Sequence, residues 1–460
     1  MKAATNRLTF LGATETVTGS KYLIETANYK LLVDCGLFQG YKSLRLRNWE
    51  EFPFNPAELD AIVLTHAHLD HSGLIPAIVR RGFRGKIYMT QGTFELCKIL
   101  WADSAKIYEE DAERANRKQY TKHQPAKPLF ELSDVERAIP LVQVVGFNQE
   151  KKLAENLSVT FLHAGHILGA SQVVLKVSNK KIHFTGDLGR SADPLMLGPA
   201  PFEGADILIT ESTYGNTQHS EVNPEQELEE TLNKVLNRGG TAVIPAFAVG
   251  RTQSLMLHIW RLMKQGKLPQ VTMYLNSPMA TSVSSLYHQH QEEHRVDPSE
   301  FDEMYSAARI VKDVGESKEL NEREEPKIII AASGMMEGGR VLHHVMKFGT
   351  DPKNAIIFTG YQAGGTRGRQ LLDGAKSVRI FHVDVAVKAE IFFMDSMSAH
   401  MDANELINWL KETKTPPEMT YVTHGEIEAT DRMRFRISDE LGWKARAATF
   451  GEAIDVDKPQ

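Results

Sequence analysis

The apolar residues in the first part of this chain lie in short runs separated by turn-forming residues, and these runs predict strands. The predicted strands are residues 8–11, 21–25, 30–33, 157–162, 173–177 and 182–185. Helical spacing replaces the strand pattern at residues 73–81 and over the long stretch 94–119. Short strands and helices in this order suit an αββα sandwich, in which two sheets pack face to face with helices outside.

From residue 206 the pattern changes to a regular alternation of strands and helices. The predicted strands are residues 207–210, 241–244, 271–275, 327–331 and 355–358, and the predicted helices are residues 224–236, a segment after Arg251, a segment from Met279 and residues 340–347. Strand–helix–strand units of this length predict a parallel, Rossmann-like sheet. We therefore expect an α/β protein in which a second domain, residues 206–385, is inserted between two parts of the first, residues 1–205 and 386–460.

Three imidazoles and a carboxylate follow the predicted strand end at residues 61–64, in the sequence Thr65-His66-Ala67-His68-Leu69-Asp70-His71. His66 and His68 would point the same way at the two-residue repeat of a strand, and Asp70 and His71 follow as the chain turns into a helix. Such a loop could hold two metal ions. The alternative is a polar surface loop that is rich in histidine.

The composition limits which residue types could bind a metal in such a loop. The 460 residues, of which 42% are hydrophobic, include only two cysteines, Cys35 and Cys97, so a metal would be bound by histidine and carboxylate. Residues 1–10 contain no apolar signal segment, and no run approaches the ~18 apolar residues of a membrane span. We therefore expect a cytoplasmic protein without membrane contact.

The net charge of −6 argues against a protein that coats nucleic acid through bulk positive charge. It leaves a nucleic-acid enzyme open, because such an enzyme needs positive charge only along its groove. Local basic groups are Lys42, Arg45 and Arg47; Arg80, Arg81 and Arg84; and Arg367 and Arg369. The alternative for each group is a solvated protein face.

Other candidate site residues lie where predicted strands end. Asp34 could orient a ligand histidine by accepting its second N–H, or it could simply form a turn beside Gly36. His163 and His166 compete as a further ligand, and Asp187 is a carboxylate that can bridge two cations.

Three loops rich in small residues are expected at the carboxyl edge of the parallel sheet, around residues 247–252, 333–335 and 360–366. Such loops bind phosphate through backbone N–H groups. The predicted substrate-binding residues are Arg251, Ser333, Gly334, Gly364, Arg367 and Arg369. Glycine turns also close most α/β units, but three such loops with arginines beside them favour an anionic polymer as the substrate.

The hexapeptide His66–His71 resembles the HxHxDH signature of the metallo-β-lactamase superfamily of binuclear metal hydrolases. That resemblance places the next ligand after Ala-Gly and so favours His166 over His163. Glu211, His400 in Ser-Ala-His-Met-Asp and His424 in Thr-His-Gly-Glu resemble the additional motifs of the β-CASP branch. This branch acts on nucleic acids and includes ribonuclease J and the endonuclease of messenger-RNA 3′-end processing.

The resemblance implies a metallo-β-lactamase αββα sandwich with an inserted β-CASP domain, and two Zn²⁺ ions or, as an alternative, Mn²⁺. Its implied ligands are His66, His68 and His166 for one metal and Asp70, His71 and His424 for the other, with Asp187 shared. The metals would activate a water for in-line attack on phosphorus, and His400, positioned by Glu211, would protonate the departing 3′ oxygen.

The resemblance therefore implies a metal-dependent ribonuclease that binds RNA, and we expect an endonuclease that leaves 5′-phosphate and 3′-hydroxyl ends. A DNA-acting nuclease of the same branch is the main alternative, because these motifs do not read the 2′-hydroxyl. A small-molecule metallo-hydrolase and a non-catalytic RNA-binding scaffold are the others. A homodimer is the candidate assembly.

Overall fold

The computed structural model describes residues 6–119 and 124–459, and it divides into two compact units. Unit 1 comprises residues 1–192, 198–218 and 400–460, and unit 2 comprises residues 193–197 and 219–399. The predicted domain boundaries, at 205/206 and 385/386, lie before the changes of unit at 218/219 and 399/400, and the short excursion of residues 193–197 into unit 2 was not predicted. The first would separate strand β11 (Ile207–Thr210) from its neighbours in unit 1, and the second would separate β19 (Glu390–Phe393) from its partner in unit 2.

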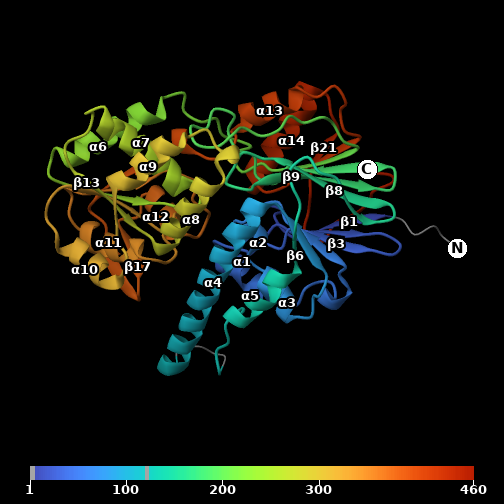
Figure 1. The fold of residues 1–460 in the computed structure, drawn as a ribbon, viewed down its shortest axis with the longest axis horizontal. Coiled ribbons are helices and arrows are strands. Elements are labelled where there is room, and N and C mark those ends of the chain that lie inside the picture. Colours follow the sequence, from blue (N-terminus) through green and yellow to red (C-terminus); the bar gives the residue numbers. More distant parts are fainter. Residues whose placement is uncertain (1–5, 120–123, 460) are drawn as a thin grey trace. The chain divides into compact units, whose positions relative to one another are not determined.

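Two mixed sheets form unit 1 (Figure 1). In order across the first sheet, the strands within the described residues are β22 (Ala453–Asp455), β1 (Arg7–Phe10), β2 (Tyr22–Glu25), β3 (Lys30–Val33), β4 (Ala61–Val63), β5 (Lys86–Met89) and β6 (Val142–Val144). Those of the second are β21 (Ala445–Ala447), β20 (Met419–Val422), β11, β10 (Lys180–Phe184), β9 (Ser171–Val177), β8 (Leu157–His163) and β7 (Lys151–Ala154). Each sheet is antiparallel at one side and parallel at the other, from β3 to β6 and from β10 to β21.

The core of unit 1 lies between these two sheets, because the inward-facing residues of both belong to one hydrophobic cluster. Aromatic pairs join the sheets directly: the rings of Phe10 and Tyr421 are 5.2 Å apart, and those of Tyr22 and Phe184 are 5.3 Å apart. Full burial of each such ring contributes about 1.5–3 kcal/mol. The packing of alternate strand residues against the facing sheet is what the apolar pattern predicts.

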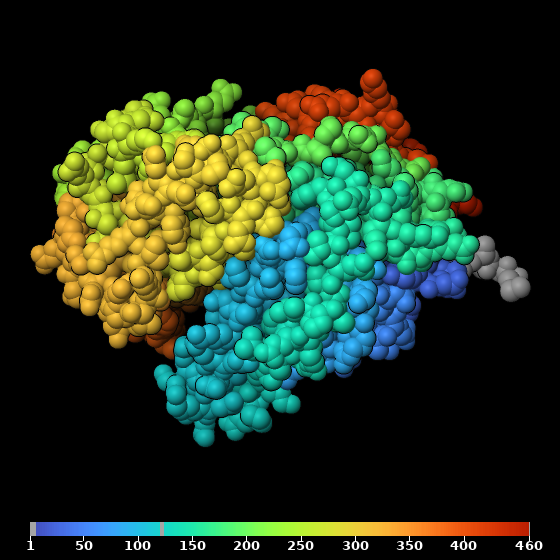
Figure 2. All heavy atoms as spheres, viewed as in Figure 1, coloured from blue at the N-terminus to red at the C-terminus, as the bar shows by residue number. Residues whose placement is uncertain are grey.

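Helices cover the outer faces of both sheets (Figure 1). The described helices of unit 1 are α1 (Lys42–Leu46), α2 (Leu69–Ser72), α3 (Ile75–Arg80), α4 (Gln91–Lys118), α5 (Leu132–Ala138), α13 (Ala403–Lys411) and α14 (Ile427–Leu441). The distal part of α4 stands out from unit 1 and is accompanied by the segment around α5 (Figure 2). There the ring of Tyr108 lies 5.1 Å from that of Phe130.

Unit 2 is built around a parallel sheet, as the alternating pattern predicts. Its strands within the described residues are, in order, β14 (Ala308–Ile310), β13 (Thr272–Asn276), β15 (Lys327–Ala331), β12 (Thr241–Pro245), β16 (Ala355–Phe358) and β19. A separate hairpin consists of β17 (Ser377–Ile380) and β18 (Val383–Ala386). The helices are α6 (Pro224–Leu236), α7 (Arg251–Lys264), α8 (Pro278–Gln289), α9 (Pro298–Ala307), α10 (Val314–Glu322), α11 (Val341–Phe348) and α12 (Arg367–Leu372).

The central strands of this sheet are buried along their whole length, which suits a sheet covered on both faces. The predicted fold class, an αββα sandwich with an inserted parallel-sheet domain, is confirmed. In the described part of the chain, no helix combines the length and the apolar character that crossing a membrane requires.

Candidate active site

The carboxyl ends of neighbouring parallel strands place the candidate residues side by side in unit 1. In the first sheet β3 and β4 run parallel, so Asp34 after β3 lies next to the loop Thr65–His71 after β4. In the second sheet β10, β11 and β20 run parallel and lead into Asp187, Glu211 and His424. The topology therefore brings together residues that are hundreds of positions apart in the sequence.

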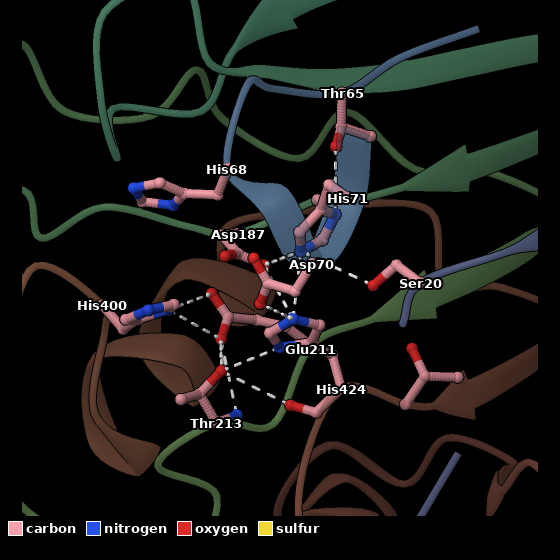
Figure 3. A network of polar contacts seen from close by, with 12 residues as sticks. Ser20, Thr65, His68, Asp70, His71, Asp187, Glu211, Thr213, His400 and His424 are labelled. Atoms are coloured by element: carbon pink, nitrogen blue, oxygen red, sulfur yellow. Dashed lines mark hydrogen bonds and ion pairs between the residues drawn. The ribbon is translucent and has the colours of Figure 1, made fainter. Parts of the chain in front are cut away.

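Seven side chains form two adjoining groups whose ligand atoms lie within 4.8 Å of one another in each group. Figure 3 labels His68, Asp70, His71, Asp187 and His424 among them. One group is His66, His68, His166 and Asp187, and the other is Asp70, His71 and His424. Asp187 faces both: its Oδ2 lies 3.3 Å from His66 Nε2 and 3.7 Å from His166 Nε2. Its Oδ1 lies 3.2 Å from His71 Nε2 and 3.6 Å from His424 Nε2.

The hydrogen bonds around the second group show that it fits a cation. His71 Nδ1 lies 2.7 Å from Asp34 Oδ2 and donates to it, so Nε2 carries a lone pair whenever this ring is neutral. Thr213 Oγ1 donates to Glu211 and therefore accepts from His424 Nδ1 at 3.1 Å, which leaves a lone pair on His424 Nε2 as well. These two Nε2 atoms face each other at 3.0 Å. Two facing lone pairs repel, and either a proton on one ring or a metal ion between the rings removes that repulsion.

Asp187 supports the same interpretation. Its Oδ1 is buried, and within the described residues no hydrogen-bond donor satisfies it. A buried anionic oxygen without a donor is costly unless it binds a metal. The donor set contains imidazole nitrogen and carboxylate oxygen, which divalent metal ions accept. The seven residues therefore fit divalent metal ions.

Burial also sets the protonation state of these groups. It lowers the pKa of His66 to about 3 and that of His68 to about 4, so both rings are neutral at pH 7. Burial would raise the pKa of Asp187, but His424, His71 and His66 hold it well below its ordinary value. Neutral imidazoles around an ionised carboxylate are the state in which these residues bind metal.

His71 differs from the other histidines. Burial lowers its pKa, but the carboxylates of Asp187 and Asp34 outweigh that effect and raise the pKa well above the ordinary value. Both carboxylates therefore favour positive charge at this imidazole, which a bound cation supplies. Asp34 also accepts from the backbone N–H and the hydroxyl of Thr65, at 2.8 and 2.9 Å, and so ties the start of the ligand loop to the end of β3.

Two glycines allow the loops to approach closely enough to form the site. A Cβ on Gly36 would lie 1.6 Å from the carbonyl oxygen of Asp70, and a Cβ on Gly189 would lie 1.9 Å from that of Gly165. The first contact places the segment after Asp34 against the ligand loop. The second places the segment after Asp187 against the turn that carries His166.

Glu211 and His400 form a pair beside the ligand groups (Figure 3). His400 Nδ1 lies 3.2 Å from Glu211 Oε2 and 3.3 Å from Oε1. Glu211 is held in place because it accepts from the backbone N–H of Leu188 at 2.5 Å and from Thr213 Oγ1 at 2.6 Å. The His400 ring centroid lies 4.4 Å from that of His166.

The charge state of this pair suits proton transfer. Burial lowers the pKa of His400, but Glu211 outweighs it and raises the pKa above the ordinary value. His400 is 16% exposed, so a substrate atom can reach its ring, whereas Glu211 is 3% exposed. Asp402 starts α13 two residues later as its N-cap and fixes the chain behind His400.

His163, the competing candidate ligand, lies outside both groups. Its ring stacks on Phe147 with centroids 3.6 Å apart, and its carbonyl oxygen accepts from Gln172 Nε2 at 2.8 Å.

In unit 2, the three predicted phosphate-binding loops meet at the carboxyl edge of the sheet. Gly334 packs against the ring of Phe247, and its carbonyl oxygen accepts from Gln362 Nε2 at 3.1 Å. Arg251 is buried beside Gly360, where a Cβ would lie 3.7 Å from its Nε. The loops after β12, β15 and β16 are therefore in contact, as expected for one edge of a parallel sheet.

The other predicted residues of this edge differ in what they contact. Ser333 Oγ accepts from the backbone N–H of Glu337 at 3.0 Å, and Gly364 lies in the turn before α12. The Arg367 guanidinium binds Glu337 and the carbonyl oxygens of Met336 and Arg379, so it holds protein segments together. Arg369 is half exposed and pairs with Asp373 one helical turn later at 2.8 Å.

Several residues that organise the site were not predicted from the sequence. They are Thr65, Thr213, Gly36 and Gly189. Thr213 follows the motif residue Glu211 by two positions, and Gly36 follows Asp34 by two, so proximity to a motif was the available signal. Threonine and glycine are both common at strand ends, so their presence alone gives no signal. The contacts of Thr213 with His424 and of Gly36 with Asp70 join parts of the chain that are distant in sequence.

Comparison with known proteins agrees with this geometry. Residues 16–221 match the metallo-β-lactamase superfamily, residues 252–371 match the Beta-Casp domain, and residues 384–448 match the Zn-dependent metallo-hydrolase RNA specificity domain. The chain is 33% identical to Ribonuclease TTHA0252 of Thermus thermophilus over 98% of its length and 100% of the relative. It is 32% identical to an RNase J-like protein of Methanocaldococcus jannaschii over 91% of its length and 92% of the relative.

A solved structure of a protein of unknown function from Enterococcus faecalis V583 resembles the fold, with a TM-score of 0.51 and 12% identity over 98% of this chain and 100% of that one.

Proposed function

Because the chain belongs to the β-CASP family of the metallo-β-lactamase superfamily, we propose that it is a metal-dependent ribonuclease that cleaves RNA internally. The observation that carries this proposal is the His400–Glu211 pair placed beside two ligand groups that share Asp187. A hydrolase for lactams or thioesters needs no such proton donor. One relative is named a ribonuclease and the other an RNase J-like protein, and these names and the match to an RNA specificity domain favour RNA as the substrate.

We propose two Zn²⁺ ions, with Mn²⁺ as the alternative, because the ligands are nitrogen and oxygen without sulfur. His66, His68 and His166 would hold one ion, Asp70, His71 and His424 the other, and Asp187 both. When bound, such a pair supplies Lewis-acid activation of water and stabilises negative charge on the phosphoryl oxygens.

His400 supplies the proton in this proposal. Glu211 holds its Nδ1, so the proton that is transferred lies on Nε2. Donation to the departing 3′ oxygen yields a 3′-hydroxyl and a 5′-phosphate end. Asp34 and Thr213 orient His71 and His424 by contacting their second nitrogens, so that Nε2 of each ring faces the ligand groups.

At the carboxyl edge of the unit 2 sheet, we propose that Arg251, Ser333, Gly334 and Gly364 contact the RNA backbone. The convergence of their loops supports this proposal. The partners of Arg367 and Arg369 favour a structural role for the first and a solvated position for the second. The homodimer and the cytoplasmic location expected from the sequence stay predictions.

The test uses end-labelled RNA and DNA of equal sequence, incubated with the purified protein with and without a chelator. Internal cleavage of RNA that stops with the chelator is the expected result. Preferred cleavage of DNA would support the alternative nuclease, and cleavage of neither, with hydrolysis of a lactam or thioester, would support the small-molecule hydrolase. Binding without any cleavage would support the scaffold.

A further inference from the structure

The short helix α1 and the turn η1 (Arg47–Trp49) expose apolar side chains that a soluble surface would normally bury. Leu46 is 53% exposed, Trp49 is 54% exposed, and Tyr41, at the N-cap of α1, is 57% exposed. None of the residues of α1 is buried. Residues three and four apart on a helix share a face, so Lys42, Arg45, Leu46 and Trp49 lie along one side. We call Tyr41, Lys42, Arg45, Leu46 and Trp49 the α1 patch.

Charge identifies what this patch can bind. The stretch from Tyr41 to Arg47 carries three basic residues and no acidic one, in a chain whose net charge is −6. The acidic residues Glu50 and Glu51 follow only beyond Trp49. Aromatic rings interleaved with cations suit single-stranded nucleic acid, because bases stack on the rings and phosphates pair with the cations.

Arg47, next to the patch in the chain, packs against two aromatic rings. Its guanidinium carbon lies 4.7 Å from the ring centroid of Phe450 and 5.5 Å from that of Phe38. The Asn48 side chain holds the same region in place, since it accepts from Phe38 N–H and donates to Phe38 carbonyl oxygen, both at 2.8 Å. Trp49 is the next residue, so these hydrogen bonds position the backbone that carries its ring.

The same segment is tied to the ligand loop. The backbone N–H of Cys35 donates to His71 carbonyl oxygen at 2.7 Å, and that of Leu37 donates to Leu69 carbonyl oxygen at 2.8 Å. Phe38, which Asn48 holds in place, is the next residue. Hydrogen bonds through Phe38 and Leu37 thus connect the segment of the α1 patch to the ligand loop, and both belong to unit 1.

We propose that the α1 patch is a stacking platform that binds single-stranded RNA next to the cleavage site, with Tyr41 and Trp49 stacking on bases and Lys42 and Arg45 contacting phosphates. This inference rests on the proposed ribonuclease function and names its substrate as unpaired RNA. A base that is already paired stacks within its own helix and cannot lie on these rings.

The experiment measures binding of fluorescently labelled RNA to the full chain carrying His400→Ala, so that cleavage of bound RNA is slow during the measurement. The probes are an unstructured single strand and the same strand annealed into a duplex. Tyr41→Ala and Trp49→Ala should each weaken binding of the single strand by roughly 5- to 100-fold and change duplex binding little. Trp49→Phe should retain most of the affinity, and metal content should equal that of the parent in all three.

Phe435→Ala is the matched control, because Phe435 is a 46% exposed ring of unit 1 with Arg434 against it but lies on α14. It should bind both probes as the parent does. Equal affinity of the Tyr41 and Trp49 variants and the parent for the single strand would overturn the proposal, and so would an equal loss for both probes. A change in self-association with unchanged RNA affinity would identify a protein interface instead. Failure of the unsubstituted protein to cleave RNA would count against the proposed function, independently of these binding differences.

Discussion

His400 and His424 both lie in unit 1, but their Nδ1 atoms contact different groups. His400 Nδ1 faces the carboxylate of Glu211, whereas His424 Nδ1 faces the hydroxyl of Thr213 and its Nε2 faces the other ligands. The first arrangement favours a protonated ring at His400, and the second turns Nε2 of His424 toward the other candidate ligands.

We therefore expect His400→Ala to lower RNA cleavage by about 100- to 10,000-fold while metal content stays unchanged. His424→Ala should lose metal and activity together. Elemental analysis and cleavage rates measure the two effects. A nitrophenyl phosphodiester, whose leaving group needs little protonation, should partly rescue the His400 variant only. Equal metal loss in both variants would rule out the proton-donor role.

Gly36 carries a second prediction at the residue scale. A methyl group there would lie 1.6 Å from Asp70 carbonyl oxygen, so Gly36→Ala forces the ligand loop away from the end of β3. We expect it to lower the free energy of unfolding by about 2 kcal/mol or more and to reduce metal content. Urea unfolding and elemental analysis are the measurements. Gly338→Ala is the control, because nothing lies within 4 Å of a Cβ there; equal behaviour of the two variants would contradict the steric argument.

At the scale of elements, the sequence predicted best where a buried strand is long and apolar. The strands at residues 207–210, 327–331 and 355–358 have the predicted bounds. Strands β14 and β19 were not predicted: β14 has only three residues, and β19 is an edge strand whose residues are only partly buried. A weak apolar signal cannot show that a short segment pairs with a sheet.

The same limit applies to the site. Ligand candidates could be named because histidine and aspartate at strand ends follow a recognisable order. Thr213 could not, because its contact with His424 joins residues that are far apart in the sequence. Arg367 was predicted to bind substrate, and its contacts with Glu337 and with the carbonyl oxygen of Arg379 depend on how loops pack.

A buried polar network links β13, α10 and α11 in unit 2. His344 Nε2 accepts from Asn276 Nδ2 at 2.7 Å, and its Nδ1 donates to Asn321 Oδ1 at 2.6 Å. Asn276 also accepts from Arg340 at 2.7 Å and donates to Ser317 at 2.8 Å. Protonation of Nε2 would remove an acceptor that this network uses.

Burial, with nearby cationic groups, lowers the pKa of His344 to about 3, so the unfolded chain binds more protons than the folded one between about pH 6.5 and pH 3. The stabilisation is present above pH 6.5 and is lost as the pH falls. Between pH 7.5 and pH 5 the protein should lose about 2 kcal/mol at most through this group. Urea unfolding should show that the free energy of unfolding of His344→Gln falls less between pH 7.5 and pH 5 than that of the unsubstituted protein, by that amount. The exposed control His288→Gln should lose as much stability over this interval as the unsubstituted protein. Identical pH profiles for all three proteins would contradict the assignment.

At the scale of the whole molecule, the site depends on parts of the chain that are far apart in sequence. Its residues run from Asp34 to His424, and the segment that forms most of unit 2 lies between Glu211 and His400 in the chain. The net charge of −6 repels RNA at long range. Affinity for RNA must therefore come from locally placed cations, and each phosphate contact adds to the dependence of binding on salt.

Arg251 is the cation whose substitution should change the salt dependence of RNA binding most clearly. It is buried at the start of α7, where the loops of the sheet edge converge, whereas Arg369 is half exposed and paired with Asp373. If Arg251 contacts a phosphate, Arg251→Gln should weaken RNA binding and reduce the slope of log affinity against log salt by about 1, because one fewer counterion is released.

Arg251→Lys keeps the charge and should keep most of the slope, and Arg369→Gln should leave it unchanged. Titrations of the His400→Ala protein at several salt concentrations measure all three slopes. A slope that falls equally for Arg251→Gln and Arg369→Gln would mean that general charge, and not the position of Arg251 at this edge, attracts the RNA.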